Sequence, residues 1–378
     1  MRNLYSLIYL FLGFTSFLAS ASWEQEQTAV GLAASHSSNR AEESTNSISK
    51  VQVTFDTTKL FQGFGIKVNA DLAANLLSDN EYQAAEDHAI GVSGKVFLSD
   101  ISNVNLGVSE ASRFGLADQR SSIYLNSTSR FQRKKTQFKF LSAKFGSDQQ
   151  IRSLTLGLNE NDDVSFIDHE FEKHRESLNR RYDVRFQNKV SEDTFVVIKL
   201  ERAEADKLST TAESTTRVTN GFLGLKTRYL GSSSIEVLLG TSQTDNFNAS
   251  GDSEIFSWRL NNELRLSDYY NLTLSAKRTF QDSNDLSFQS NNVEAYTLKG
   301  NYIPTDFISL SLVANRSERQ LNDTDRVVEE DLSLSMDYNL IENWSVAAGI
   351  NWVKQNDTRD EFDFDETKVA VGLKWQVY

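Results

Sequence analysis

Cysteine is absent from this 378-residue chain, and proline occurs once. Without cysteine, no disulfide framework and no thiolate metal site can form. Proline removes a ladder donor, so a chain with a single proline is free to be sheet along almost its whole length. After residue 21 no apolar run approaches the roughly 20 residues of a membrane helix, and mean hydropathy is −0.44. These absences argue against a bundle of membrane-spanning helices.

Acidic residues outnumber basic ones, 52 to 39, which gives a formal net charge of −13. An acidic chain is a poor partner for nucleic acid, and none is expected. His169 and His174, among acidic neighbours, could suggest a metal site or an acid/base pair, but solvated loop residues are the favoured interpretation. The same holds for the acidic stretch 357–366, which could otherwise bind divalent cations at a lipopolysaccharide surface. No catalytic residue, metal or cofactor is predicted, and the chain is not expected to be an enzyme.

The first 21 residues have the pattern of a secretory signal peptide. Arg2 precedes an apolar run from Leu4 to Phe17, and Ala19-Ser20-Ala21 supplies a small-x-small cleavage site. Residues 22–60 are rich in polar residues and lack clear alternation, which predicts a flexible periplasmic segment. The remaining residues, 61–378, are predicted to form one β-domain.

Strict alternation of apolar and polar residues dominates that domain. In the last strand, Val369, Val371, Leu373, Trp375 and Val377 share one face. The other face is polar or small, and the chain ends on Tyr378. Alternation of this kind is typical of strands with two different surroundings. A terminal strand with one apolar face and an aromatic end is typical of transmembrane barrels. Leu373, Trp375, Val377 and Tyr378 are therefore the expected assembly signal, read by the barrel assembly machinery.

The connections between strands alternate in length. Short ones lie at 191–193, 230–233, 267–269, 304–306 and 341–343. Long polar ones are expected near 160–178, 206–216, 245–254, 282–292, 319–329 and 356–366. Short periplasmic turns alternating with long outer loops distinguish a membrane barrel from a soluble β-sandwich. The predicted fold is therefore all-β: a transmembrane, up-and-down, antiparallel β-barrel in the outer membrane of a Gram-negative bacterium.

The pattern favours about sixteen strands. An even number of strands brings both ends of the chain to the periplasmic side. Splitting 123–145 in two and counting a short strand at 51–56 would give about eighteen. That alternative would place the long 76–87 connection on the periplasmic side, so sixteen is preferred.

The polar face of each strand should point into the barrel, where it would line a pore. The residues expected there are Lys67, Lys95, Arg185, Lys199, Lys226, Arg228, Arg259, Glu263, Arg265, Lys277, Lys299, Asp337 and Lys374. Basic residues outnumber acidic ones in this set although the chain is acidic overall. A basic wall favours anions in a confined pore. The alternative is that inward charges only neutralise each other across neighbouring strands.

Three segments carry a resemblance to a known family. They are an Arg-Thr-Phe strand end at 278–280, a Tyr-Ile-Pro-Thr turn at 302–305, and a Trp-Ser-Val-Ala-Ala-Gly strand start at 344–349. With the terminal strand, they resemble the outer-membrane β-barrel porin family associated with exopolysaccharide biosynthesis and export operons. The resemblance covers residues 250–378 well and earlier strands only in architecture. It implies an outer-membrane role linked to surface polysaccharide.

The expected function is thus a pore or accessory channel linked to exopolysaccharide export or biosynthesis. A general or anion-selective diffusion porin, and an outer-membrane barrel enzyme, are the alternatives. The expected partners are outer-membrane lipids and lipopolysaccharide, the barrel assembly machinery and polysaccharide export components.

Overall fold

Strands make up almost all of the structure, a computed structural model. It describes residues 25–41, 44–61, 63–77, 85–116, 131–146, 151–167, 172–209, 213–230, 232–246, 253–282, 290–320, 326–341, 343–358 and 364–377. The strands are β1 (Gln25–Ala41), β2 (Ser44–Phe61), β3 (Phe64–Leu77), β4 (Ala85–Ser99), β5 (Ser102–Leu116), β6 (Phe131–Phe145), β7 (Arg152–Ile167), β8 (Glu172–Lys189), β9 (Thr194–Ser209), β10 (Glu213–Tyr229), β11 (Ser233–Asn246), β12 (Ser253–Arg265), β13 (Tyr270–Asp282), β14 (Ser290–Thr305), β15 (Ile308–Gln320), β16 (Arg326–Ile341), β17 (Trp344–Asp357) and β18 (Phe364–Val377). Within these ranges no helix is long and apolar enough to cross a membrane.

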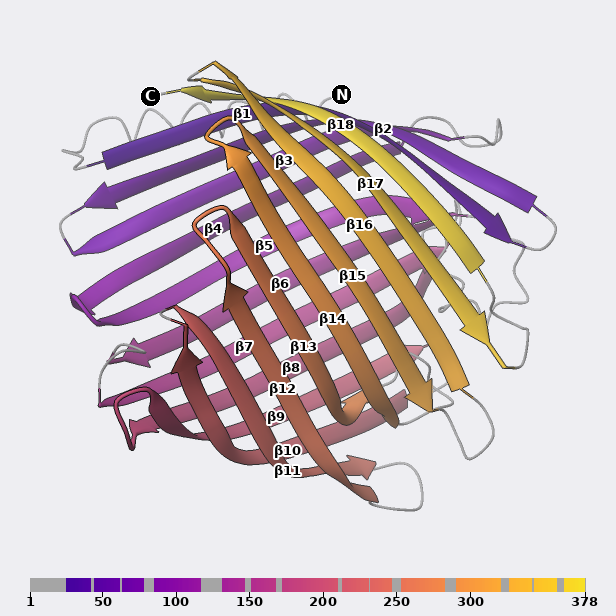
Figure 1. The fold of residues 1–378 in the computed structure, drawn as a ribbon. Coiled ribbons are helices and arrows are strands. Elements are labelled where there is room, and N and C mark those ends of the chain that lie inside the picture. The colour runs from indigo at the N-terminus through magenta and orange to yellow at the C-terminus, as the bar shows by residue number, and fades with distance from the viewer. Residues whose placement is uncertain are drawn as a thin grey trace.

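The strands form one closed barrel (Figure 1). Each strand pairs antiparallel with its neighbours in the chain, and β18 pairs with β1 to close the sheet. In that closing pair Thr28 lies opposite Val377 and Arg40 opposite Asp365, so β1 starts where β18 ends. Closure leaves no sheet edge with unpaired backbone groups. The predicted all-β, up-and-down, antiparallel barrel is confirmed.

The number of strands is eighteen rather than the preferred sixteen. Both additional strands, β1 and β2, come from residues 25–61, where the sequence predicts a flexible segment. That prediction failed because the inner face of β1 has small rather than polar residues: Ala29, Gly31 and Ala33 alternate with Val30 and Leu32 of the outer face. Contrast between the two faces, the usual signal of a strand, is therefore weak. The first strand begins at Gln25, whereas the predicted signal peptide at 1–21 lies outside the described residues.

The route to eighteen strands also differs from the alternative that the sequence left open. The described part of 123–145 is one strand, β6, and residues 117–130 lie outside the described ranges. Both extra strands precede residue 62, so the side on which every later turn lies is unchanged. The connection between β3 and β4 consequently stays at the end opposite to the short turns, which removes the objection to eighteen.

Several strands run farther into the expected long loops than the alternation predicts. β7 continues to Ile167 and β8 begins at Glu172, so His174 lies in a strand, while His169 lies outside the described residues. The acidic stretch 357–366 is likewise partly strand, in β17 and β18. Alternation disappears there because both faces carry polar residues. Backbone pairing nevertheless continues, and a ladder of charges accompanies it on the outer face: Lys139 to Glu160 at 2.8 Å and Arg180 to Glu160 at 3.2 Å.

The outer face carries a belt of exposed apolar side chains. Register places Leu223 and Leu225 of β10 beside Leu239 and Val237 of β11, with exposed fractions between 40% and 58%. The belt continues around the barrel through pairs such as Leu312 with Leu334. A continuous apolar belt on a closed sheet is the surface that contacts lipid.

Aromatic pairs border this belt at the end that carries the short turns. Phe61 stacks on Phe64, Tyr270 on Tyr302 and Trp344 on Trp375, with ring centroids 4.4, 4.3 and 5.9 Å apart. Rings with a polar atom favour the boundary between hydrocarbon and water. The turn end of the barrel therefore has the composition of a membrane interface.

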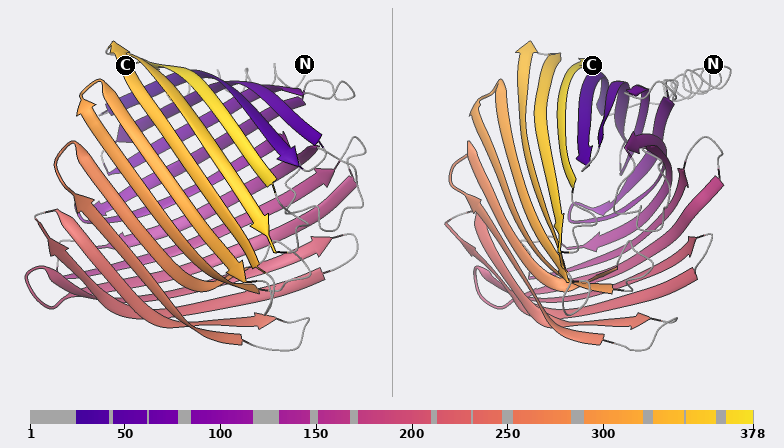
Figure 2. Two further views of the ribbon diagram at one scale, coloured as in Figure 1. Left: turned by 45° about the vertical axis from the view of Figure 1, so that its right-hand side comes forward. Right: turned by 90° about the vertical axis from the view of Figure 1, so that its right-hand side faces the viewer.

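The barrel is bent sharply around β10 and β11, so that two walls face each other (Figure 2). Gly240 lies at this corner, where an added β-carbon would be 1.8 Å from the carbonyl oxygen of Gly221. Only glycine permits such an approach. Inside the corner Val197, Phe222 and Leu238 form a buried cluster. The corner brings the inner faces of β9 and β12 within side-chain reach of each other.

Candidate functional site: a basic wall inside the barrel

The inner face is the face opposite to the apolar belt. Strand register places every expected pore-lining residue on it: Lys67, Lys95, Arg185, Lys199, Lys226, Arg228, Arg259, Glu263, Arg265, Lys277, Lys299, Asp337 and Lys374. The structure brings only some of them together. Arg185, Lys199, Arg259 and Lys277 gather at the bent side of the barrel, and the others are distributed around the wall.

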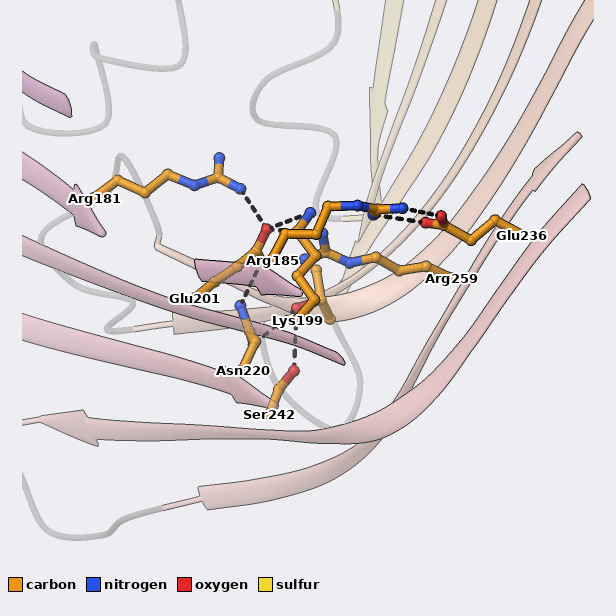
Figure 3. A network of polar contacts seen from close by, with 9 residues as sticks. Arg181, Arg185, Lys199, Glu201, Asn220, Glu236, Ser242 and Arg259 are labelled. Carbon is orange, nitrogen blue, oxygen red and sulfur yellow. Dashed lines mark hydrogen bonds and ion pairs between the residues drawn. The ribbon is translucent and has the colours of Figure 1, made fainter. Parts of the chain in front are cut away.

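Glu201 is the centre of the gathered group (Figure 3). Its carboxylate, on β9, is 3% exposed and binds cations from three strands. Arg181 of β8 and Lys199 of β9 both approach at 2.8 Å. Arg259 of β12 binds both carboxylate oxygens, one of them at 2.9 Å. A bidentate guanidinium–carboxylate pair of this kind is among the stronger polar contacts in proteins.

Arg259 is held from a second side by an aromatic ring. Its guanidinium carbon lies 4.4 Å from the ring centroid of the buried Phe222 on β10. The ring face attracts the cation, and the flat contact fixes the plane of the guanidinium. One donor is left over, because the Nε–H of Arg259 is buried and has no acceptor within the described ranges.

A second ion pair crosses the wall beside the first. Arg185 on β8 binds Glu236 on β11 through both terminal nitrogens. Strands β9 and β10 separate these residues in the sheet, so only the bend allows the contact. The alternative of pairing between neighbouring strands therefore describes neither this contact nor that of Arg259 with Glu201.

Hydroxyl and amide groups fill the space below Glu201. The Thr279 hydroxyl donates to the side-chain oxygen Oδ1 of Asn220 at 3.2 Å, and the side-chain nitrogen of Asn220 donates to Glu201 at 3.4 Å. Ser242 lies 2.5 Å from Ser257 and 3.1 Å from Thr279. These groups hold β10, β11 and β13 together and fix the orientation of Glu201.

Lys277 differs from the other cations of the group. Register places it on β13 directly opposite Arg259, with Ala295 of β14 on its other side. No carboxylate of the described chain lies within ion-pair distance of it. Asp183, directly opposite Glu201, likewise forms no ion pair with any described residue. Around Glu201 the basic side chains outnumber the carboxylates: Arg181, Arg185, Lys199, Arg259 and Lys277 face Glu201, Glu236 and Asp183.

The remaining expected residues have separate surroundings. Lys67 pairs with Asp56 at 2.8 Å, Lys95 lies over the Phe97 ring at 4.9 Å and Arg228 over the Phe195 ring at 5.3 Å. Lys226 faces Glu236 in register. Arg265, Lys299 and Lys374 are exposed on the inner face. Asn220, Phe222 and Thr279 were not expected. Asn220 lies directly opposite Glu201 on the neighbouring strand, whereas Phe222 and Thr279 make contacts that cross intervening strands.

The terminal strand, β18, has its apolar side chains on the lipid-facing side of the barrel. Leu373 is paired with Val346 on one side and Leu32 on the other, within the apolar belt, and Trp375 stacks on Trp344. Val377 ends β18, and Tyr378 lies outside the described residues. Recognition by the assembly machinery stays a prediction. No group of three or more His, Asp or Glu residues in the described ranges is placed to hold a metal ion.

Comparison with known proteins rests on structure alone. No family model and no curated protein matches the sequence. The solved structures it resembles include the FrpB iron transporter from Neisseria meningitidis (F5-1 variant), with a TM-score of 0.56 and 8% identity over 89% of this chain. They also include the siderophore receptor PirA from Acinetobacter baumannii (TM-score 0.52, 8%, 93% of this chain) and the ferric-catecholate import receptor Fiu from E. coli K12 (TM-score 0.54, 6%, 94%).

Together with the closed sheet and the apolar belt, this likeness decides the architecture. The chain is an outer-membrane β-barrel. It spans 64% of the FrpB chain, 81% of PirA and 82% of Fiu, so it matches only part of the length of these chains. The exopolysaccharide association expected from the sequence receives no support from these neighbours.

Proposed function

We propose that this barrel is a channel for anionic solutes. The observation that carries the proposal is the excess of cations on the inner face of β8 to β13. Arg181, Lys199 and Arg259 share Glu201, and Lys277 has no acid partner in the described chain. Inside a barrel, low-dielectric walls strengthen the field of such charges, which raises the local concentration of anions.

The proposed orientation follows from the lengths of the connections. Short turns belong on the periplasmic side of outer-membrane barrels and longer loops outside. The start of β1 and the end of β18 then both lie on the periplasmic side, and residues 1–21 act as the export signal. The predicted partners are lipids and lipopolysaccharide around the belt, the assembly machinery during insertion and polysaccharide export components at the periplasmic end.

The first candidate cargo is an acidic exopolysaccharide. It rests on the resemblance of residues 250–378 to barrels of exopolysaccharide operons, and on the wall, since uronic acid polymers carry a carboxylate on many sugar units. A general anion-selective porin would use the same wall without a dedicated polymer.

The second candidate is import of a ferric catecholate. Fiu, one of the structural neighbours, is a ferric-catecholate import receptor. Iron(III) held by three catecholates is an anion, so the same basic wall would attract it. Both an acidic polymer and a ferric catecholate therefore require a positively charged lumen. The two cargoes differ in size and in the direction in which they cross the membrane.

Proteoliposomes test the proposed function. The purified barrel is reconstituted, and efflux of a glucuronate oligomer is compared with that of a glucose oligomer of equal length. Faster efflux of the glucuronate oligomer supports an anion channel for acidic polymer. Exclusion of both oligomers, with uptake of a ferric catecholate, supports the second candidate. Equal efflux of the charged and the neutral oligomer contradicts anion preference.

A further inference from the structure

The inner wall carries two cationic groups side by side whose demand for an acceptor is not met by the described chain. Lys277 and Arg259 lie directly opposite each other on β13 and β12, on the same face of the sheet. Like charges in this position repel each other. A partly buried pair of cations is normally accompanied by a carboxylate, because an uncompensated charge away from water is costly.

The carboxylate that binds Arg259 is already occupied. Glu201 accepts from Arg181, Lys199, Arg259 and Asn220, which uses both of its oxygens. It therefore compensates Arg259 in part and leaves Lys277 without an acid partner in the described chain. A saturated carboxylate cannot serve a fourth cation with good geometry.

Arg259 supplies the second observation. Its two terminal nitrogens bind Glu201 and its face packs on Phe222, so its position is fixed. Its Nε–H is nevertheless buried and lacks an acceptor in the described chain. Most buried donors in proteins are bonded to the chain, to water or to a bound group, so this donor is free to accept a partner of that kind. The partner must be an acceptor, because both groups are donors only.

On the side away from Arg259, the register neighbour of Lys277 is small. Its register partner on β14 is Ala295, whose side chain is a single methyl group. The neighbours on its own strand, Ser275 and Thr279, are hydroxyl residues already bound to Asn261 and Asn220. Apart from Arg259, the immediate sheet neighbours of Lys277 are thus small or hydroxyl side chains, and none of them carries a negative charge.

We propose that Lys277, backed by Arg259, forms a discrete binding site in the barrel wall for an oxyanion group, a carboxylate, sulfate or phosphate. This inference rests on the proposed anion channel and gives it a saturable step. A permeating anion would stop at Lys277, lose part of its hydration shell and then move on. Binding must be weak enough for release, as in other selective pores.

Planar bilayers containing the full barrel test the site. Conductance is measured in about 0.1 M KCl, where the screening length is about 10 Å, while sodium sulfate or sodium glucuronate is added. The proposal expects a saturable fall in chloride current with at least one of the two probes. Block by sulfate alone indicates a site for small inorganic oxyanions, and block by glucuronate indicates a site for the carboxylate of a sugar.

Two variants make the test specific. Lys277→Gln should raise the half-blocking concentration about tenfold, the effect of losing one charged hydrogen bond. Lys299→Gln, on the same inner face but exposed and outside the Glu201 group, should leave it unchanged. Heat-modifiable migration on gels confirms that both variants are folded.

The outcomes separate this inference from the proposed function. Anion-selective conductance without saturable block, or with equal block in Lys277→Gln and the wild type, overturns the site and leaves the channel proposal standing. Saturable block that depends on Lys277 in a cation-selective pore supports the site and contradicts the channel proposal.

Discussion

Arg259 on β12 binds both carboxylate oxygens of Glu201 on β9, although β10 and β11 lie between their strands in the wall. The contact exists because the sheet bends at β10 and β11 until its inner faces meet. The shape of the barrel therefore determines where positive charge collects, because the same bend gathers cations from several strands around one buried carboxylate.

Replacing Glu201 with Ala should destabilise the barrel strongly. Arg181, Lys199 and Arg259 would be left without their shared carboxylate, and breaking a buried pair costs about 3–5 kcal/mol. The free energy of unfolding in urea, measured on barrels refolded into lipid vesicles, reports the loss.

Glu263→Ala is the matched control. Glu263 also lies on the inner face, but it is exposed, and its hydrogen bond within the described chain is to Asn261, at 3.1 Å. Its removal should change stability by about 0.5 kcal/mol or less. Equal losses for the two variants would show that the Glu201 group does not hold the bend.

Gly240→Ala should impair folding. The new β-carbon would meet the Gly221 carbonyl oxygen at 1.8 Å, and backbone atoms cannot move aside as a flexible side chain can. Overpacking of this kind costs about 1–3 kcal/mol or more. The folded fraction is measured by heat-modifiable migration. Gly300→Ala, whose β-carbon would lie 3.7 Å from Leu272, should fold as the wild type does; a similar defect there would make the corner irrelevant.

Val371→Arg should cost about 2–4 kcal/mol of stability in lipid vesicles, because a charge in the middle of the lipid face must be dehydrated. Val371 is 53% exposed in the apolar belt, whereas Lys368 of the same strand lies on the inner face. Lys368→Glu should therefore have little effect. A larger loss of stability for Lys368→Glu than for Val371→Arg would show that the inner and outer faces are assigned the wrong way round.

Epitope tags test the orientation. A tag after Thr358, in the β17–β18 connection, should bind antibody on intact cells. A tag after Asp268, in the short β12–β13 turn, should bind only after the outer membrane is permeabilised. Both positions are exposed, so a tag should not disturb the sheet. If only the tag after Asp268 were stained on intact cells, the barrel would have the opposite orientation in the membrane.

The face of each strand could be predicted well from the sequence, for a simple reason. Lipid and lumen impose opposite demands on alternate residues, so pairs such as Trp258 and Arg259 can be assigned without a structure. Prediction failed where that contrast is absent. The inner face of β1 has small residues in place of polar ones. The outer ends of β7 and β8 have polar residues on both faces, because these ends extend beyond the apolar belt.

The side-chain contacts inside the barrel could not be predicted from the alternation of apolar and polar residues. Lys199, Arg259 and Lys277 could be placed on the inner face, but which of them meet depends on the bend at Gly240. That bend is a property of the closed sheet, and no local pattern reports that β9 and β12 approach each other. For the same reason Phe222, which holds Arg259 from two strands away, carried no signal in the sequence.

Ion selectivity is the most direct test of an anion channel. In planar bilayers under a KCl gradient, the reversal potential should show preference for chloride. Changing Arg265, Lys299 and Lys374 together to Glu should shift it towards potassium, since all three are exposed on the inner face. The control changes Lys139, Arg180 and Arg316 to Glu on the outer face, where exposed ion pairs contribute little. An anion-selective wild type whose preference only the inner-face triple variant reverses is the predicted result. A cation-selective wild type, or equal shifts for the two triple variants, would contradict it.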